Sequence, residues 1–314
     1  MQHSNILLVL VASATGLTAC SGGSSTGSSA VYSVPDGTAA EALEAGRTLT
    51  ATQESAAAIT RDFDAETAMA TADPSASVRK NAAGGLDLTV AGRTISFSPA
   101  DTRADGYGYE IAGASIWTWS TESMAEAIDP AVPGYVRVFD YHTDLEPGGE
   151  QSGFIVTGTE TRPAALAALP TATYFGRARV RVAPTEGFAD WNDSVSEARG
   201  DMALTANFGA GTVSGGITNL DSRAPRNVDP TRTWTPFAGS VALGSAPITG
   251  NSFTGAVTAD AAFQSTIGTI DAGSTYSGRF YGPEAQQAAG VFNLTGTAAG
   301  GGTMIGWGQF QTGR

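Results

Sequence analysis

Imidazole and thiol groups, which carry much of the metal-binding and nucleophilic chemistry of proteins, are scarce in this sequence of 314 residues. It contains two histidines, His3 and His142, and a single cysteine, Cys20. A zinc site of the common kinds takes its ligands from several Cys and His side chains. A nucleophilic mechanism needs a base held next to the nucleophile. With so few of these groups, we expect a protein that is not an enzyme and has no metal site.

Three arginines, Arg177, Arg179 and Arg181, stand at alternate positions in the segment 171–182. Small or apolar residues alternate with polar ones there, which is typical of a strand, so we expect the three guanidinium groups on one face. If the strand belongs to a barrel and this face points outward, the face is exposed to solvent by default. It could instead receive a carboxylate-rich partner, because guanidinium groups bind carboxylates through paired hydrogen bonds. The three arginines are therefore candidate partner-binding residues.

Two glycine-rich runs have a composition that could cradle a phosphate group. They are Gly209-Ala210-Gly211 and Gly300-Gly301-Gly302. Neither precedes a helical pattern, and neither has the lysine that a phosphate-binding loop uses. We expect both runs to be turns.

The charge of the chain limits the partners that it can bind. It has 30 acidic and 17 basic residues, a net charge of -13 and a pI of about 4.5. Such a surface repels the phosphates of nucleic acids, and no basic stripe long enough to release their counterions is visible. The chain has 40 glycines and few long helical patterns. This composition favours a β-rich protein with many tight turns.

The first half of the chain is predicted to hold short strands and one or two helices. The helices are expected between residues 38 and 72, which are rich in Ala and Glu. The strands are expected at 86–90, 94–97, 107–111, 116–119 and 135–139. The aromatic residues of this half are expected to form its core; if exposed, they would form a protein-binding patch. They are Tyr107, Tyr109, Trp117, Trp119 and Tyr135.

The second half shows a clearer pattern of strands separated by turns. Strands are expected at 171–182, 201–208, 211–217, 252–257, 277–281, 290–294 and 304–308. The pattern predicts an antiparallel up-and-down barrel of about eight strands. Residues 31–150 have a strongly negative net charge, whereas residues 151–314 are nearly neutral. This step predicts a domain boundary near residue 150.

The N-terminus resembles a bacterial lipoprotein signal peptide with its lipobox. An apolar run, Ile6 to Val11, is followed by small residues and then by Leu17-Thr18-Ala19-Cys20. The resemblance implies removal of residues 1–19 and acylation of Cys20. Ser21 follows the cysteine, which favours the outer membrane. Residues 20–36 then hold the lipidated cysteine and a Gly/Ser tether, before an N-terminal β-rich domain at 37–150 and a barrel at 151–314.

Three segments of the second half resemble the barrel of transferrin-binding protein B-like surface lipoproteins. Residues 278–285 and 289–292 are similar to its terminal hairpin, in which Phe280 and Phe292 could face a shared interior. Residues 171–176 are similar to its first strand, and residues 206–217 to a following hairpin. The resemblance implies a mainly β fold, with an eight-stranded antiparallel up-and-down barrel at the C-terminus. The N-terminal half would be a smaller, handle-like β-rich domain.

The resemblance also implies a function and a role for His142. Because the family includes haem-acquisition proteins, His142 is a candidate haem ligand, although a lone histidine beside two aspartates is more often an exposed loop residue. The implied function is a lipid-anchored binder at the cell surface that captures an iron or haem source. Its partners would be a host iron- or haem-carrying protein and an outer-membrane transporter. The alternative is a protective, immune-evasion-type surface lipoprotein that binds a protein and no nutrient.

Overall fold

The computed structural model describes most of the chain from residue 48 onward. The described residues are 48–50, 57–62, 67–72, 76–104, 108–118, 135–144, 151–158, 160–185 and 194–314. Cys20, the signal peptide and the tether lie outside them. The expected aromatic residues Tyr107 and Trp119 do so too.

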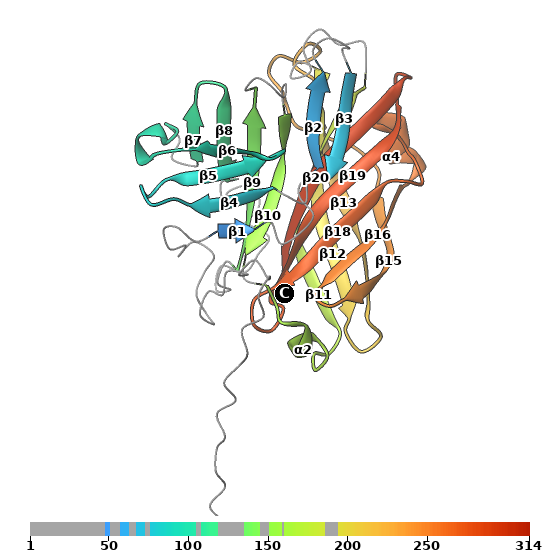
Figure 1. Ribbon diagram of the computed structural model, residues 1–314. Coiled ribbons are helices and arrows are strands. Elements are labelled where there is room, and N and C mark those ends of the chain that lie inside the picture. The colour runs from blue at the N-terminus through green and yellow to red at the C-terminus, as the bar shows by residue number, and fades with distance from the viewer. Residues whose placement is uncertain are drawn as a thin grey trace, which may run out of the picture.

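Eight antiparallel strands form a closed barrel in the second half of the chain (Figure 1). They are β11 (Ala172–Pro184), β12 (Ser196–Asn207), β13 (Thr212–Arg223), β15 (Val241–Thr249), β16 (Ser252–Ala259), β18 (Thr275–Tyr281), β19 (Gln287–Ala298) and β20 (Thr303–Gly313). Each strand pairs with its neighbours in sequence, and β20 pairs with β11 to close the ring. The up-and-down barrel predicted from the sequence is confirmed.

Large side chains fill the inside of the barrel. On β11, Tyr174, Ala178 and Val180 point inward and are buried, whereas the alternate residues face outward. Phe280 and Phe292 pack in the same interior cluster, as the sequence predicted. Further rings complete the filling: Phe208, Phe253, Tyr276 and Phe310. A barrel of this size has room for little beyond its own side chains.

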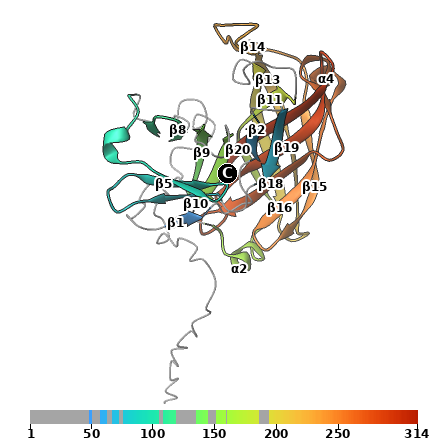
Figure 2. The same cartoon turned by 45° about the horizontal axis from the view of Figure 1, so that its top comes forward.

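Two smaller antiparallel sheets lie beside the barrel (Figures 1 and 2). The six-stranded sheet has the order β3 (Thr67–Ala72), β2 (Ala57–Asp62), β10 (Gln151–Gly158), β9 (Val136–Thr143), β8 (Ala114–Thr118), β7 (Gly108–Ile111). The four-stranded sheet has the order β1 (Thr48–Thr50), β4 (Ser77–Lys80), β5 (Leu86–Val90), β6 (Arg93–Ser96). The helices expected between residues 38 and 72 are wrong where that segment is described, because those parts form β1, β2 and β3.

A second hydrophobic core joins the six-stranded sheet to the outside of the barrel. Val138 and Ile155 of the sheet lie in one buried cluster with Val291 and Trp307, which belong to β19 and β20. Trp307 is completely buried, although it points out of the barrel. The outer face of the barrel is therefore apolar where the sheet covers it. The two parts form one packed body.

The remaining elements are short. They are the 3-10 helix η1 (Pro99–Asp101), the helices α2 (Pro163–Leu166) and α4 (Ala261–Thr266), and the strands β14 (Thr235–Pro236) and β17 (Gly268–Ile270). Turns occupy the two glycine-rich runs at 209–211 and 300–302. Within the described residues, no helix is both long and apolar enough to cross a membrane.

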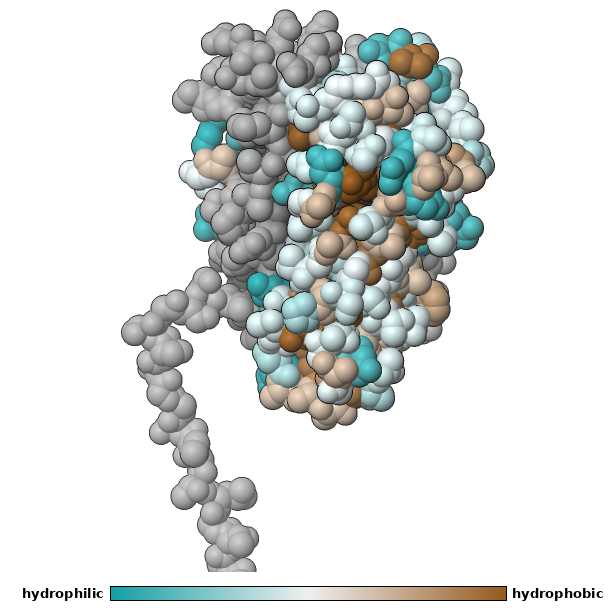
Figure 3. Space-filling view, turned by 90° about the vertical axis from the view of Figure 1, so that its right-hand side faces the viewer, coloured by the Kyte–Doolittle hydropathy of each residue, from teal (hydrophilic) through white to brown (hydrophobic). Residues whose placement is uncertain are grey.

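The side of the barrel formed by β15 and β16 carries no charged residue on either strand. Its outward positions are small and exposed, among them Ala242, Gly244, Thr254 and Thr258. Figure 3 shows this side as a mixed surface of pale and tan residues, with brown hydrophobic patches near its middle and scattered hydrophilic residues. The charged side chains gather elsewhere, on the outer face of β11, β12 and β13.

Candidate functional site

The three arginines predicted to share one face lie on the outer face of β11. Each is paired with a carboxylate of this chain: Arg177 with Asp201, Arg179 with Glu197, and Arg181 with Asp140. The Arg177 pair is part-exposed, with side-chain exposures of 36% and 42%. The expectation of a solvated face is therefore correct only at Arg177. The other two arginines are covered, because the six-stranded sheet and the connection after β13 lie over them.

Glu197, on β12, is the centre of this charged group. One carboxylate oxygen accepts hydrogen bonds from Arg179, with its Nε at 2.6 Å. The other accepts from Arg223 at 2.8 Å and from Arg232 at 2.7 Å. The Nε atom of Arg181 lies 3.9 Å from this second oxygen. A single buried carboxylate thus binds or faces four guanidinium groups.

The charge of Glu197 is held by these contacts. Burial by itself raises the pKa of a carboxyl group. Here the guanidinium groups of Arg179, Arg181 and Arg223 outweigh burial and lower the pKa of Glu197 to about 2. For Arg179 burial is the stronger effect: it lowers the pKa to about 9, although the neighbouring charge of Glu197 favours the protonated guanidinium. Glu197 and Arg179 are therefore both charged at neutral pH.

An indole ring lies among the same arginines. Trp234 stands in the connection between β13 and β15, next to β14, which Figure 2 shows at the top of the barrel. The guanidinium carbons of Arg199, Arg223 and Arg179 lie 4.1, 4.7 and 5.7 Å from the ring centroid. These distances are those of cation–π contacts. Arg199 also forms an ion pair with Asp221 at 3.1 Å.

The contact between Arg181 and Asp140 joins the barrel to the six-stranded sheet. The guanidinium donates two hydrogen bonds to the carboxylate, at 2.8 and 2.5 Å. Asp140 lies on β9 and is completely buried. A partner that used Arg179 or Arg181 would have to displace Glu197 or Asp140. As partner-binding residues these two arginines stay a prediction, as does Arg177.

His142 lies near this junction, on β9 two residues after Asp140 and on the same face. It is paired in register with Ser115 of β8 and Ser152 of β10, so it stands within the sheet and is half-buried. Burial lowers the pKa of its imidazole; Arg181 adds to this effect and Asp144 opposes it. Neutral imidazole is the form that ligates iron. A haem-ligand role for His142 stays a prediction.

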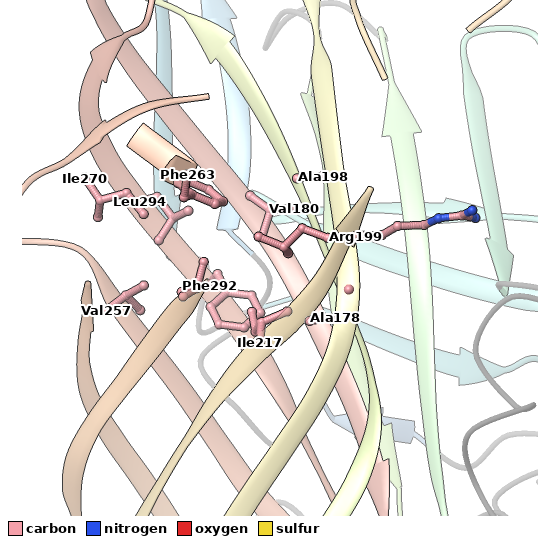
Figure 4. Close-up of a pocket in the computed structure, with 13 residues that line it drawn as sticks. Ala178, Val180, Ala198, Arg199, Ile217, Val257, Phe263, Ile270, Phe292 and Leu294 are labelled. Atoms are coloured by element: carbon pink, nitrogen blue, oxygen red, sulfur yellow. The ribbon is translucent and has the colours of Figure 1, made fainter. Parts of the chain in front are cut away.

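A small cavity lies inside the barrel (Figure 4). Its volume is about 20 Å³, and its walls include Val180, Ile217, Phe263 and Phe292. Figure 4 shows the guanidinium of Arg199 pointing away from it. A cavity of this size holds about one water-sized molecule. Haem does not fit there.

The predicted aromatic core of the first half is only partly buried. Of the expected aromatic core, Tyr135 is buried, while Tyr109 and Trp117 are half-buried, and Arg103 lies over the Trp117 ring. Among the residues that the structure describes, no three His, Cys, Asp or Glu side chains are placed together to hold a metal ion.

Sequence reasoning singled out the arginines but missed their partners. Strand pairing alone could have found part of the group, because Arg177 is opposite Asp201 and Arg181 is opposite Glu197 on β12. Arg232 and Trp234 gave no such signal, since they lie in a connection that only the fold brings back over the strands.

The fold and the site define a β-barrel protein whose charged side chains, among the described strands of the barrel, lie on the outside. Residues 168–307 match the family of C-lobe and N-lobe beta barrels of Tf-binding protein B. The chain therefore carries a transferrin-binding protein B-like barrel domain. No curated protein matches the chain.

Solved structures of transferrin-binding protein B were also found. A mutant of the protein from Haemophilus parasuis Hp5 is 14% identical with a TM-score of 0.43, covering 82% of this chain and 45% of that one. The isotype 1 protein from serogroup B Neisseria meningitidis is 18% identical with a TM-score of 0.41, covering 73% and 39%. The chain thus spans less than half the length of these proteins.

Proposed function

We propose that this protein is a non-enzymatic, lipid-anchored surface protein of the outer membrane that binds an iron or haem source. The match of residues 168–307 to the barrels of Tf-binding protein B carries this proposal. The scarcity of histidine and cysteine supports a binder over an enzyme, since the chain has two histidines and one cysteine.

The ligand binds on the outside of the molecule. The barrel interior is filled by aromatic rings, and its cavity of about 20 Å³ is too small for a cofactor. Binding groups are then supplied by the connections at the ends of the barrel and by the adjoining sheets. Such connections are where binding residues concentrate on rigid scaffolds.

The binding test uses the full lipoprotein, purified in detergent. Two probes are compared: haemin, followed by its Soret band, and iron-loaded transferrin, followed by surface plasmon resonance. We expect saturable binding of one of the two. If haemin binds through His142, the variant His142→Ala loses the Soret shift. Failure of both probes would contradict an iron or haem role, and a stoichiometric serum partner without iron would favour the protective alternative.

The proposed lipid anchor at Cys20 is tested separately. In the variant Cys20→Ser, acylation has no thiol to modify, so we expect the protein to leave the membrane fraction. Its barrel should keep the same denaturation midpoint, because Cys20 precedes every described strand. Cys20→Ser protein that stayed membrane-bound would contradict the lipid anchor.

A further inference from the structure

Positive charge is concentrated at one place in an acidic protein. Apart from Arg177, which is paired with Asp201, six of the 17 basic residues gather on the outer face of β11, β12 and β13 and in the connection that follows β13. They are Arg179, Arg181, Arg199, Arg223, Arg226 and Arg232, and the carboxylates among them are Asp140, Glu197, Asp221 and Asp229. The surplus is two positive charges, in a chain whose net charge is -13.

The internal carboxylates do not account for this surplus. Glu197 has its oxygens filled by Arg179, Arg223 and Arg232. A buried carboxylate is neutralised by one or two well-placed partners, and each further buried charge adds desolvation cost. Repulsion between the arginines acts on Arg232. Burial lowers the pKa of Arg232, and the charges of Arg223 and Arg226 lower it further, whereas the charge of Glu197 opposes this change.

The outer members of the group are accessible. The side chain of Arg199 is 38% exposed and that of Arg223 is 22% exposed. Arg226 is exposed, and Val228, two residues further on, is 71% exposed. Trp234 holds three of the guanidinium groups by cation–π contacts. Arginine and tryptophan side chains are the types that dominate binding energy at protein interfaces.

We propose that the surface formed by Arg199, Arg223, Arg226, Val228 and Trp234 is a docking site for a carboxylate-rich segment of a partner protein. We call it the arginine–tryptophan surface. Its groups spread over two strands and a connection, which suits an extended segment better than a small molecule. A segment bearing acidic side chains is complementary to the surplus charge. Val228 offers an apolar contact beside the charges.

This proposal deepens the proposed function, since it names a surface and the chemistry of its partner. The chain as a whole has a net charge of -13, whereas positive charge is in surplus at the arginine–tryptophan surface. A long nucleic acid would meet repulsion beyond it. The proposal therefore commits to carboxylates of a protein segment.

The test measures binding of a fluorescein-labelled, glutamate-rich peptide to the full lipoprotein by fluorescence anisotropy. The double variant Arg199→Gln/Arg226→Gln removes two exposed charges without touching Glu197. We expect its dissociation constant to rise by about tenfold, and the affinity of the unaltered protein to fall as salt is added. The matched control is Arg162→Gln, an exposed arginine before α2, which should bind as the unaltered protein does.

Each other outcome overturns the proposal. These outcomes are absence of peptide binding at low salt, a loss of binding in Arg162→Gln equal to that in the double variant, and binding of an oligothymidylate as tight as that of the peptide. The last result would indicate a general polyanion site. None of these outcomes bears on haemin or transferrin binding, so the two proposals fail independently.

Discussion

At the scale of single residues, Glu197 shows why a buried charge can stabilise this fold. Taking a carboxylate out of water costs several kcal/mol unless its partners repay that cost. Three arginines that are distant in sequence donate to Glu197, and they come from β11, β13 and the connection after it. The contact therefore forms only when β11, β12 and β13 have paired and the connection after β13 has folded back over them. Its contribution depends on keeping the carboxylate ionised.

Removing that charge should be costly. The variant Glu197→Gln keeps the size of the side chain but leaves the arginines without their counter-charge. We expect the free energy of unfolding to fall by about 3 kcal/mol or more, as for a buried pair that loses one member. Urea denaturation measures it. The matched control is Asp201→Asn, which breaks the part-exposed pair with Arg177 and should cost about 1 kcal/mol or less.

His142 predicts a pH dependence of stability. Because burial holds the pKa of its imidazole below the ordinary value of 6.5, the unfolded chain takes up a proton more readily than the folded one. This contribution to stability is fully present above pH 6.5 and is lost as the pH falls below 6.5 and through the lower pKa of the folded protein. We expect His142→Gln to flatten this loss between pH 7 and pH 5. Parallel pH curves for the two proteins would show that His142 is not responsible.

At the scale of elements, the strength of the hydrophobic alternation decided what the sequence could predict. The expected strand at 86–90 is β5 without change, and the segment 171–182 became β11. In contrast, β10 was missed because nearly all of its residues are buried, so its sequence shows no alternation. β15 was missed as well, since its exposed positions hold Gly, Ser and Pro.

The error at residues 38–72 has a different cause. Alanine has the highest intrinsic helix propensity, but such propensities are small in free energy, and pairing with other strands overrides them. β2 pairs with β10, whose sequence lies about ninety residues further on. A local pattern does not report such a contact. The candidate site was hidden for the same reason, because Asp140 reaches Arg181 across 41 residues.

Close approach of strands in the barrel makes one glycine testable. A Cβ atom at Gly290 of β19 would overlap the carbonyl oxygen of Ser277 on β18 and lie 2.6 Å from the Phe310 ring. We expect Gly290→Ala to lower the free energy of unfolding by about 1–3 kcal/mol, as overpacking does. The control is Gly300→Ala, in the turn before β20, where nothing lies within 4 Å. Equal stability of the two variants would contradict this packing.

At the scale of the whole molecule, the barrel and the six-stranded sheet are coupled in two ways. Trp307 and Val291 pack against Val138 and Ile155 of the sheet in a shared core. The hydrogen bonds between Arg181 and Asp140 add a directional contact at the same junction. Apolar packing fixes the two parts together, and the ion pair specifies how they align. The arginine–tryptophan surface lies beside this junction, so its geometry depends on it.

The variant Asp140→Asn tests this coupling, because it leaves Arg181 charged, buried and without its carboxylate. We expect faster hydrogen exchange at the backbone amides of β9 and β10, with exchange in β15 and β16 unchanged. The matched variant Arg181→Met removes the positive charge of this pair. The double variant Asp140→Asn/Arg181→Met should recover part of the stability lost in Asp140→Asn, because it leaves no buried charge without a partner. Uniform acceleration across all strands would indicate that Asp140 supports the whole fold instead. In that case the sheet and the barrel would unfold as a single cooperative unit.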